Sequence, residues 1–122
     1  MESINIITHK IIGCCFHVHN TLGSGFNEKA YHQSLILTLQ KQSLNIQTEK
    51  PINIVFENIK VGQSRLDLVV EDLVIIEVKA QAGCLPIIFR QQLLSYLKAS
   101  GLRIGLLVNF GNKSCEIKRF VV

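Results

Sequence analysis

Asp67, Glu77 and Lys79 are the residues whose types and spacing could do chemistry together. They lie in two apolar runs within residues 65–79, which predict a pair of β-strands joined by a short acidic turn. Side chains alternate faces along a strand, so Glu77 and Lys79 share one face. A three-residue turn centred on Asp72 would set Asp67 opposite Glu77, whereas a turn of even length would put it on the wrong face. Two carboxylates beside an ammonium suit a hard divalent cation.

A plainer interpretation of these charges is a solvated strand face with a cross-strand ion pair, because a Glu-x-Lys pattern is common. The segment between the charges, 73–76, is almost wholly apolar, which predicts a central strand covered on both sides. Charges at the end of a buried strand are costly unless they are paired or bound to a metal. The apolar segment therefore favours a functional site.

The composition fits one domain that spans residues 1–122. The chain has 122 residues, of which 48% are hydrophobic, so it is long and apolar enough to fold around one core. No apolar stretch approaches the ~20 residues of a membrane span, and the N-terminus lacks the pattern of a signal peptide. We therefore expect a cytoplasmic protein without a membrane partner.

The charge and the cysteines say little about function. A net charge of +4 permits contact with a polyanion but is equally typical of an ordinary soluble surface. The four cysteines form no Cys-x-x-Cys motif. Cys14 and Cys15 lie in an apolar helical pattern and are predicted to be buried free thiols.

Three helices and several strands are expected to position the charged residues. Apolar periodicity predicts helices over about 3–20, 27–42 and 86–99, and strands over 46–50, 52–56, 104–110 and 115–122, besides the strand pair of 65–79. Turn signals stand at 57–58 and 62–64. This order predicts an α/β sandwich with a mixed sheet rather than a repeating parallel fold.

Polar residues on two of the helices are further candidates. Glu28 lies in the first turn of the second helix, where it either favours the helix dipole or reaches inward to the site. Spacing alone leaves these two alternatives even. Tyr31 belongs to the inner face of the same helix. Gln92 and Tyr96 are four residues apart and share a face of the third helix.

These residues resemble the motifs of the PD-(D/E)XK nuclease superfamily, and more closely those of a small family within it named for a G-x-x-E-x-x-Y motif. The matching segments are Gly25-Phe-Asn-Glu28-Lys-Ala-Tyr31, Arg65-Leu-Asp67, Ile76-Glu77-Val-Lys79-Ala80, Gln92-Leu-Leu-Ser-Tyr96-Leu-Lys98 and Gly105-Leu-Leu-Val-Asn109-Phe-Gly111. They cover nearly the whole chain in the expected order, and the spacing of Gln92 and Tyr96 is similar to that of RecB-type exonucleases. The resemblance implies a restriction-endonuclease-like αβββαβ core, with a mixed central sheet flanked by helices and an extra N-terminal helix over 1–22 packed on the core.

The resemblance also implies roles for individual residues. Asp67, Glu77, Glu28 and the backbone carbonyl of Val78 would bind magnesium or manganese. Lys79 would orient the attacking water or offset charge on the phosphate. The residues that would position the substrate or Lys79 are Gln92, Tyr96 and Tyr31. The pattern departs from the family at Phe89, where relatives often carry a histidine just before the helical glutamine.

The expected function is therefore metal-dependent phosphodiester hydrolysis of nucleic acid, with DNA as the first substrate to consider. The alternatives are a catalytically silent nucleic-acid-binding module and a protein-interaction module in which the charges form only a buried ion network. A homodimer is also open, since small nucleases often pair to cut two strands.

Overall fold

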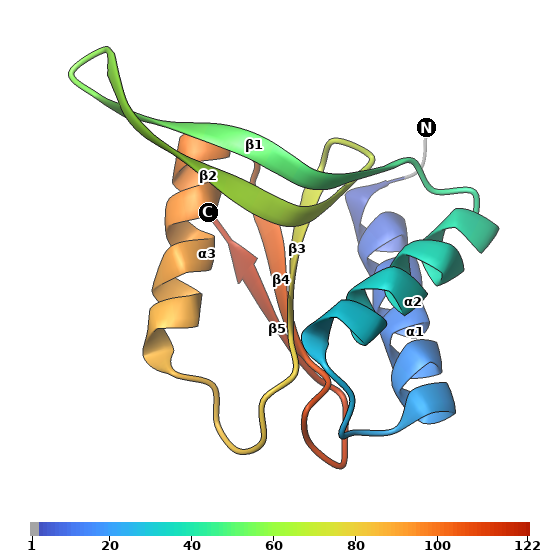
Figure 1. The fold of residues 1–122 in the computed structure, drawn as a ribbon. Helices are drawn as coiled ribbons and strands as arrows, with labels where there is room; N and C mark the ends of the chain where they lie inside the picture. Colours follow the sequence, from blue (N-terminus) through green and yellow to red (C-terminus); the bar gives the residue numbers. More distant parts are fainter. Residues whose placement is uncertain (1–2) are drawn as a thin grey trace.

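The described part of the chain, residues 3–122, folds into three helices and five strands (Figure 1). The structure, a computed structural model, describes residues 3–122. The helices of this part of the chain are α1 (Ile4–Leu22), α2 (Glu28–Lys41) and α3 (Ile87–Ser100). The strands are β1 (Ile46–Phe56), β2 (Ile59–Val70), β3 (Val74–Lys79), β4 (Ile104–Asn109) and β5 (Glu116–Val121). The element order confirms the α/β expectation.

The five strands form one mixed sheet in the order β1-β2-β3-β4-β5. The pair β3–β4 is parallel and is connected through α3, whereas the other three pairs are antiparallel. The third strand is the central one, and every residue from Val74 to Val78 is buried. This topology confirms the restriction-endonuclease-like core, and it places Glu77 and Lys79 at the carboxyl end of the central strand.

Helices cover both faces of the sheet, with α1 and α2 on one face and α3 on the other (Figure 1). The predicted apolar stripe of the first helix is buried against the core at Ile7, Ile11, Cys14 and Val18. The N-terminal helix α1 therefore packs on the core, and residues 1–2 of the span expected for it lie outside the described residues. Cys14 and Cys15 are buried free thiols, which also confirms their prediction.

The β1–β2 hairpin is longer than the sequence pattern predicted. β1 runs without a break through Pro51, which is tolerated because β1 is an edge strand and needs no N–H on its outer side. The turn predicted at 57–58 is confirmed, with Glu57 and Asn58 both left-handed (φ 51° and 66°). The turn predicted at 62–64 is wrong, because these residues lie inside β2 and pair with β1. The ladder shifts register next to Gly62, so the glycine marks a bulge instead of a turn.

Among residues 3–122, no helix combines the length and the apolar composition that crossing a bilayer would require.

Candidate active site

The turn between β2 and β3 sets the register of the candidate site. Val70 pairs with Val74 and Leu68 with Ile76, so three residues, 71–73, form the turn. The first two, Glu71 and Asp72, adopt left-handed backbone conformations with φ of 54° and 53°. The structure therefore has the odd-length turn that sets Asp67 opposite Glu77.

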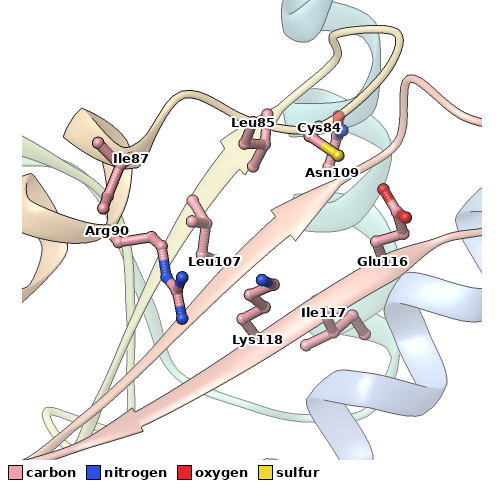
Figure 2. A pocket seen from close by; sticks show the side chains of 9 residues that line it. All are labelled: Cys84, Leu85, Ile87, Arg90, Leu107, Asn109, Glu116, Ile117 and Lys118. Atoms are coloured by element: carbon pink, nitrogen blue, oxygen red, sulfur yellow. The ribbon is translucent and has the colours of Figure 1, made fainter.

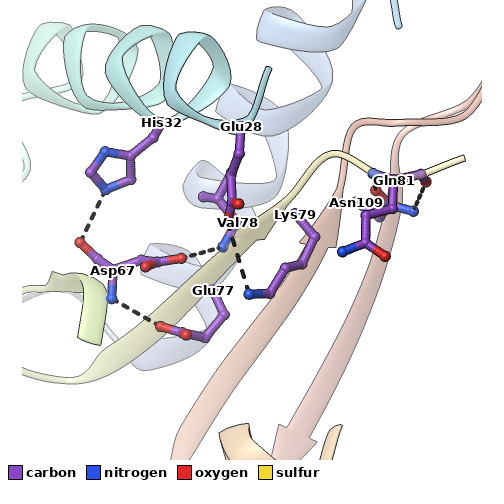
Figure 3. Close-up of polar contacts among 8 residues, drawn as sticks. All are labelled: Glu28, His32, Asp67, Glu77, Val78, Lys79, Gln81 and Asn109. Carbon is purple, nitrogen blue, oxygen red and sulfur yellow. Dashed lines mark hydrogen bonds and ion pairs between the residues drawn. The ribbon is translucent and has the colours of Figure 1, made fainter. Parts of the chain in front are cut away.

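Asp67 and Glu77 are linked by reciprocal contacts between their side chains and the backbone (Figure 3). The backbone N–H of Asp67 donates to Oε2 of Glu77 over 2.9 Å, and the backbone N–H of Val78 donates to Oδ2 of Asp67 over 2.8 Å. One oxygen of each carboxylate is thus fixed by a hydrogen bond from the strand backbone. Because a carboxylate is planar and rigid, this bond also orients the second oxygen of the same group.

The backbone N–H and carbonyl of Asp67 form hydrogen bonds with side chains because the β1–β2 ladder is irregular at this point. Thr48 pairs with Leu68 and Lys50 with Leu66, but Glu49 and Asp67 form no ladder pair between them. The Asp67 carbonyl instead accepts a hydrogen bond of 3.1 Å from Nε2 of His32 on α2. Glu49 adopts a left-handed conformation with φ of 47°, which is strained for a non-glycine residue.

Lys79 lies between the two helix layers at the end of β3. Its ammonium is 3.9 Å from Oε1 of Glu28 on α2 and 4.3 Å from the ring centroid of Phe89 on α3. The Lys79 side chain is 17% exposed, whereas that of Glu28 is 51% exposed. Glu28 is the acidic residue of the first turn of α2 and its carboxylate also lies near Lys79, so the structure has the features of both alternatives.

The start of α2 brings Glu28 to this position. Asn27 caps the helix by accepting a hydrogen bond from the N–H of Ala30 at 2.9 Å. The preceding turn passes through Gly25, whose φ of 108° favours glycine. The hydroxyl of Tyr31 donates to the carbonyl of Gly23 at 2.6 Å and accepts from the N–H of Phe26 at 3.2 Å.

Tyr31 lies in the core, on the buried inner face of α2. Its side chain is completely buried, and its ring stacks on Phe110 with centroids 4.8 Å apart. The apolar inner face of α2 and the aromatic partner on the sheet outweigh the cost of burying a hydroxyl whose hydrogen bonds are satisfied. Tyr31 therefore holds the turn from which Glu28 emerges and does not line the open surface.

The two polar residues of α3 differ in their surroundings. The hydroxyl of Tyr96 accepts a hydrogen bond of 3.1 Å from Oγ of Ser64 on β2, and its ring packs against the α3 side of the core. Gln92 is exposed and lies three residues after Phe89 and four before Tyr96, which puts all three on one stripe of the helix. Gln92 thus faces solvent between Phe89, which contacts Lys79, and Tyr96, which contacts Ser64 of β2.

Burial and crowding of like charges raise the pKa of two carboxyl groups of the site, those of Glu77 and Glu28. Burial, reinforced by the neighbouring negative charge of Asp67, raises the pKa of Glu77 to about 8, although Lys79 opposes this shift. Burial also raises the pKa of Glu28, and here Lys79 opposes the shift while Asp67 adds to it. Three carboxylates therefore share one ammonium, and added positive charge would stabilise their ionised forms.

The donor atoms at the end of β3 fit a hard divalent cation by their chemistry. Lys79 accepts a hydrogen bond through its carbonyl from Phe110, next to β4, at 2.9 Å. Since successive residues of a strand direct their backbone groups to opposite sides, the carbonyl of Val78 points toward β2 and Asp67. Carboxylate and carbonyl oxygens are the ligands that Mg²⁺ prefers. Within residues 3–122, however, no three acidic, histidine or cysteine side chains are already gathered as a metal cluster.

Asn109 supports the segment that leaves Lys79, a role that sequence reasoning missed. Its buried side chain accepts from the N–H of Gln81 and Gly111, both at 3.0 Å, and donates to the carbonyl of Gln81 at 2.9 Å. Gly111 lies so close to the backbone of Gln81 that any Cβ would collide with it. The sequence pattern that could have indicated Asn109 is a polar residue followed by Phe-Gly at the end of a buried strand.

The contact of His32 with Asp67 was also missed. It could have been indicated by the spacing of four residues between Glu28 and His32, which puts both on one face of α2.

A comparison with protein families shows the superfamily of this chain. The model of the PD-(D/E)XK nuclease superfamily matches residues 5–120. The chain belongs to this superfamily. Searches of curated proteins and of solved structures found no match.

Proposed function

We propose that the protein hydrolyses phosphodiester bonds of nucleic acid in a reaction that requires magnesium or manganese. The observation that carries this proposal is the pairing of Asp67 with Glu77 at the end of the central strand, with Lys79 two residues further on. Metal-dependent cleavage of nucleic acid is what membership of the PD-(D/E)XK nuclease superfamily suggests. The oxygens of Asp67, Glu77 and Glu28 and the carbonyl of Val78 would bind the ion.

Each residue of the candidate site would contribute a separate part of the chemistry. A bound divalent ion supplies a Lewis acid and lowers the pKa of water. The ammonium of Lys79 would offset the charge that develops on the phosphate oxygens. Gln92, whose side chain is exposed on α3, would contact the substrate. Tyr96 and Tyr31 would act as positioning residues, through Ser64 and through the turn that delivers Glu28.

Several finer assignments belong to the same proposal. The motifs support a place in the G-x-x-E-x-x-Y family and in the RecB-like branch, with residues 1–122 as one nuclease-like domain. DNA is the first substrate to test, and a homodimer would allow both strands of a duplex to be cut. We propose the cytoplasm as the location, in keeping with a nucleic-acid substrate.

The direct test is cleavage of labelled single-stranded and double-stranded DNA and RNA in magnesium, manganese or EDTA. The wild type should cleave at least one of these substrates only with metal, and Glu77→Gln should not. Glu57→Gln, which removes a carboxylate from the β1–β2 turn, is the matched control and should cleave normally. Metal should raise the melting temperature of the wild type but not that of Glu77→Gln, because a ligand stabilises the state it binds. Wild-type protein without metal-dependent cleavage would refute the proposal.

One observation favours a catalytically silent nucleic-acid-binding module as the second candidate. The ring of Phe89 lies against the Lys79 ammonium and covers a group that catalysis needs to present to phosphate. A silent module would bind nucleic acid with a steep dependence on salt and show no cleavage in any metal. Phe89→Ala would not restore cleavage in that case, whereas in an active enzyme it would alter the rate.

A further inference from the structure

A cavity of about 410 Å³ lies beside the candidate active site, over β4 and β5 (Figure 2). We call it the flanking cavity. Leu107 and Lys118 line it, and the register places Glu77, Leu107 and Lys118 in one row across β3, β4 and β5. Residues paired in this way project from the same face of a sheet. Leu107 belongs to the cluster that packs under α3, so the flanking cavity and Glu77 share the α3 face.

The walls of the flanking cavity combine positive charge with apolar surface. Arg90 of α3 and Lys118 of β5 extend into the space between the two elements (Figure 2). Leu85, Ile87 and Leu107 supply apolar walls. This combination is what a nucleotide requires, because its phosphate needs cations and its base and sugar need an apolar surface.

The charges that line the flanking cavity remain positive in sum. The one carboxylate in its lining, Glu116, accepts a hydrogen bond of 2.6 Å from Nδ2 of Asn112 in the β4–β5 loop, and its negative charge is exceeded by the two positive charges of Arg90 and Lys118. The N-terminus of α3 begins at Ile87 in the cavity wall, without a side-chain cap and without an acidic residue in its first turn. The positive end of the helix dipole adds to the potential of Arg90 and Lys118.

The distance from the active site also fits one nucleic-acid strand. Lys118 lies two strands away from Glu77, which at ~4.8 Å per strand spacing is about 10 Å. A duplex rises about 3.4 Å per nucleotide, so this separation corresponds to roughly three nucleotides. The flanking cavity is therefore within reach of the strand whose phosphate would lie at Lys79.

We propose that the flanking cavity binds a nucleotide of the substrate strand, within about three nucleotides of the scissile phosphate, with its phosphate between Arg90 and Lys118. This inference rests on the proposed function, which identifies the bound nucleic-acid strand as the substrate. It assigns to residues outside the candidate active site a role in binding the substrate.

The test uses Cys84, an exposed thiol in the wall of the flanking cavity, as a built-in reporter. The probe is a 12-nucleotide single-stranded DNA, added in EDTA so that it is not cut. Bound DNA should slow alkylation of Cys84 by iodoacetamide, measured by mass spectrometry. Arg90→Ala and Lys118→Ala should each weaken binding roughly tenfold. Each should also reduce the slope of log affinity against log salt by about 0.7.

Lys41→Ala is the matched control, because Lys41 ends α2, thirteen residues or about 20 Å from Glu28 along the helix. It removes the same charge and should leave the alkylation rate, the affinity and the salt slope almost unchanged. Unaltered Cys84 reactivity with DNA present, or wild-type affinity of both cavity variants, would overturn the inference.

Failure of the proposed function gives a different result. Protection of Cys84 without metal-dependent cleavage by the wild type would refute the nuclease and support the flanking cavity as a binding site. Cleavage without protection would refute the flanking cavity alone. Neither cleavage nor protection would refute both.

Discussion

Asp67 and Glu77 face each other across β2 and β3, and the backbone N–H of Asp67 donates to the Glu77 carboxylate at 2.9 Å. The N–H of Val78 returns a hydrogen bond to Asp67. The pair is therefore oriented by the strands themselves rather than by a loop, and its geometry is stable before any ligand arrives.

Asp67→Asn should abolish the metal-dependent rise in melting temperature and lower cleavage by at least about 100-fold. The amide oxygen of asparagine can still accept from Val78, so the fold should persist while the charge needed by the ion is lost. Differential scanning fluorimetry with manganese measures the first effect and a cleavage assay the second. A wild-type response to manganese in this variant would remove Asp67 from the metal site.

Lys79→Met should separate metal binding from catalysis. Methionine keeps an apolar stem against Phe89 but lacks the ammonium, so manganese should still raise the melting temperature while cleavage falls by about 100-fold or more. The informative comparison is with Asp67→Asn under identical conditions. If both variants bound manganese equally well, the division of roles between carboxylates and lysine would be wrong.

Glu77→Gln should stabilise the metal-free protein at alkaline pH. The pKa of Glu77 in the folded state is raised to about 8, above its ordinary value of 4.5, so the folded state retains a proton that the unfolded state releases. The resulting contribution to stability is complete below pH 4.5 and is lost as the pH rises through 8. Since each pKa unit is worth about 1.4 kcal/mol, the variant should gain up to a few kcal/mol near pH 8.

Urea denaturation in EDTA at pH 5 and pH 8 measures this gain, which should be much smaller at the lower pH. A gain of equal size at both values would show that the glutamine acts through packing rather than through loss of the charge. Magnesium should restore much of the wild-type stability at pH 8, because a bound cation favours the ionised carboxylate.

Tyr31→Phe should cost about 1 kcal/mol of unfolding free energy, because the hydroxyl bonds to Gly23 and Phe26 are lost while the stack on Phe110 remains. If Tyr31 acts only by holding the turn before Glu28, cleavage should fall with little change in the Michaelis constant. A large rise in the Michaelis constant at normal stability would instead indicate direct contact with substrate.

The order of helices and strands, and the sharing of a face by Glu77 and Lys79, could be predicted from the sequence. Both depend on local periodicity, since apolar residues recur at helical spacing in α1 and side chains alternate in β3. The pairing of Asp67 with Glu77 could be stated only as a condition on the length of the turn. The turn signal at 62–64 misled because a glycine that permits a bulge resembles one that permits a turn.

Contacts between elements distant in the sequence were decided by the tertiary structure alone. The ring of Phe89 against Lys79, the hydrogen bond from His32 to the Asp67 carbonyl and the burial of Tyr31 each join elements from different layers of the fold. Periodicity specifies which face of a helix is apolar, but the neighbour of each side chain depends on how the layers pack. The amino-acid pattern therefore determined which residues could form a nuclease site, and the packing of α2 and α3 around the end of β3 determined how they meet.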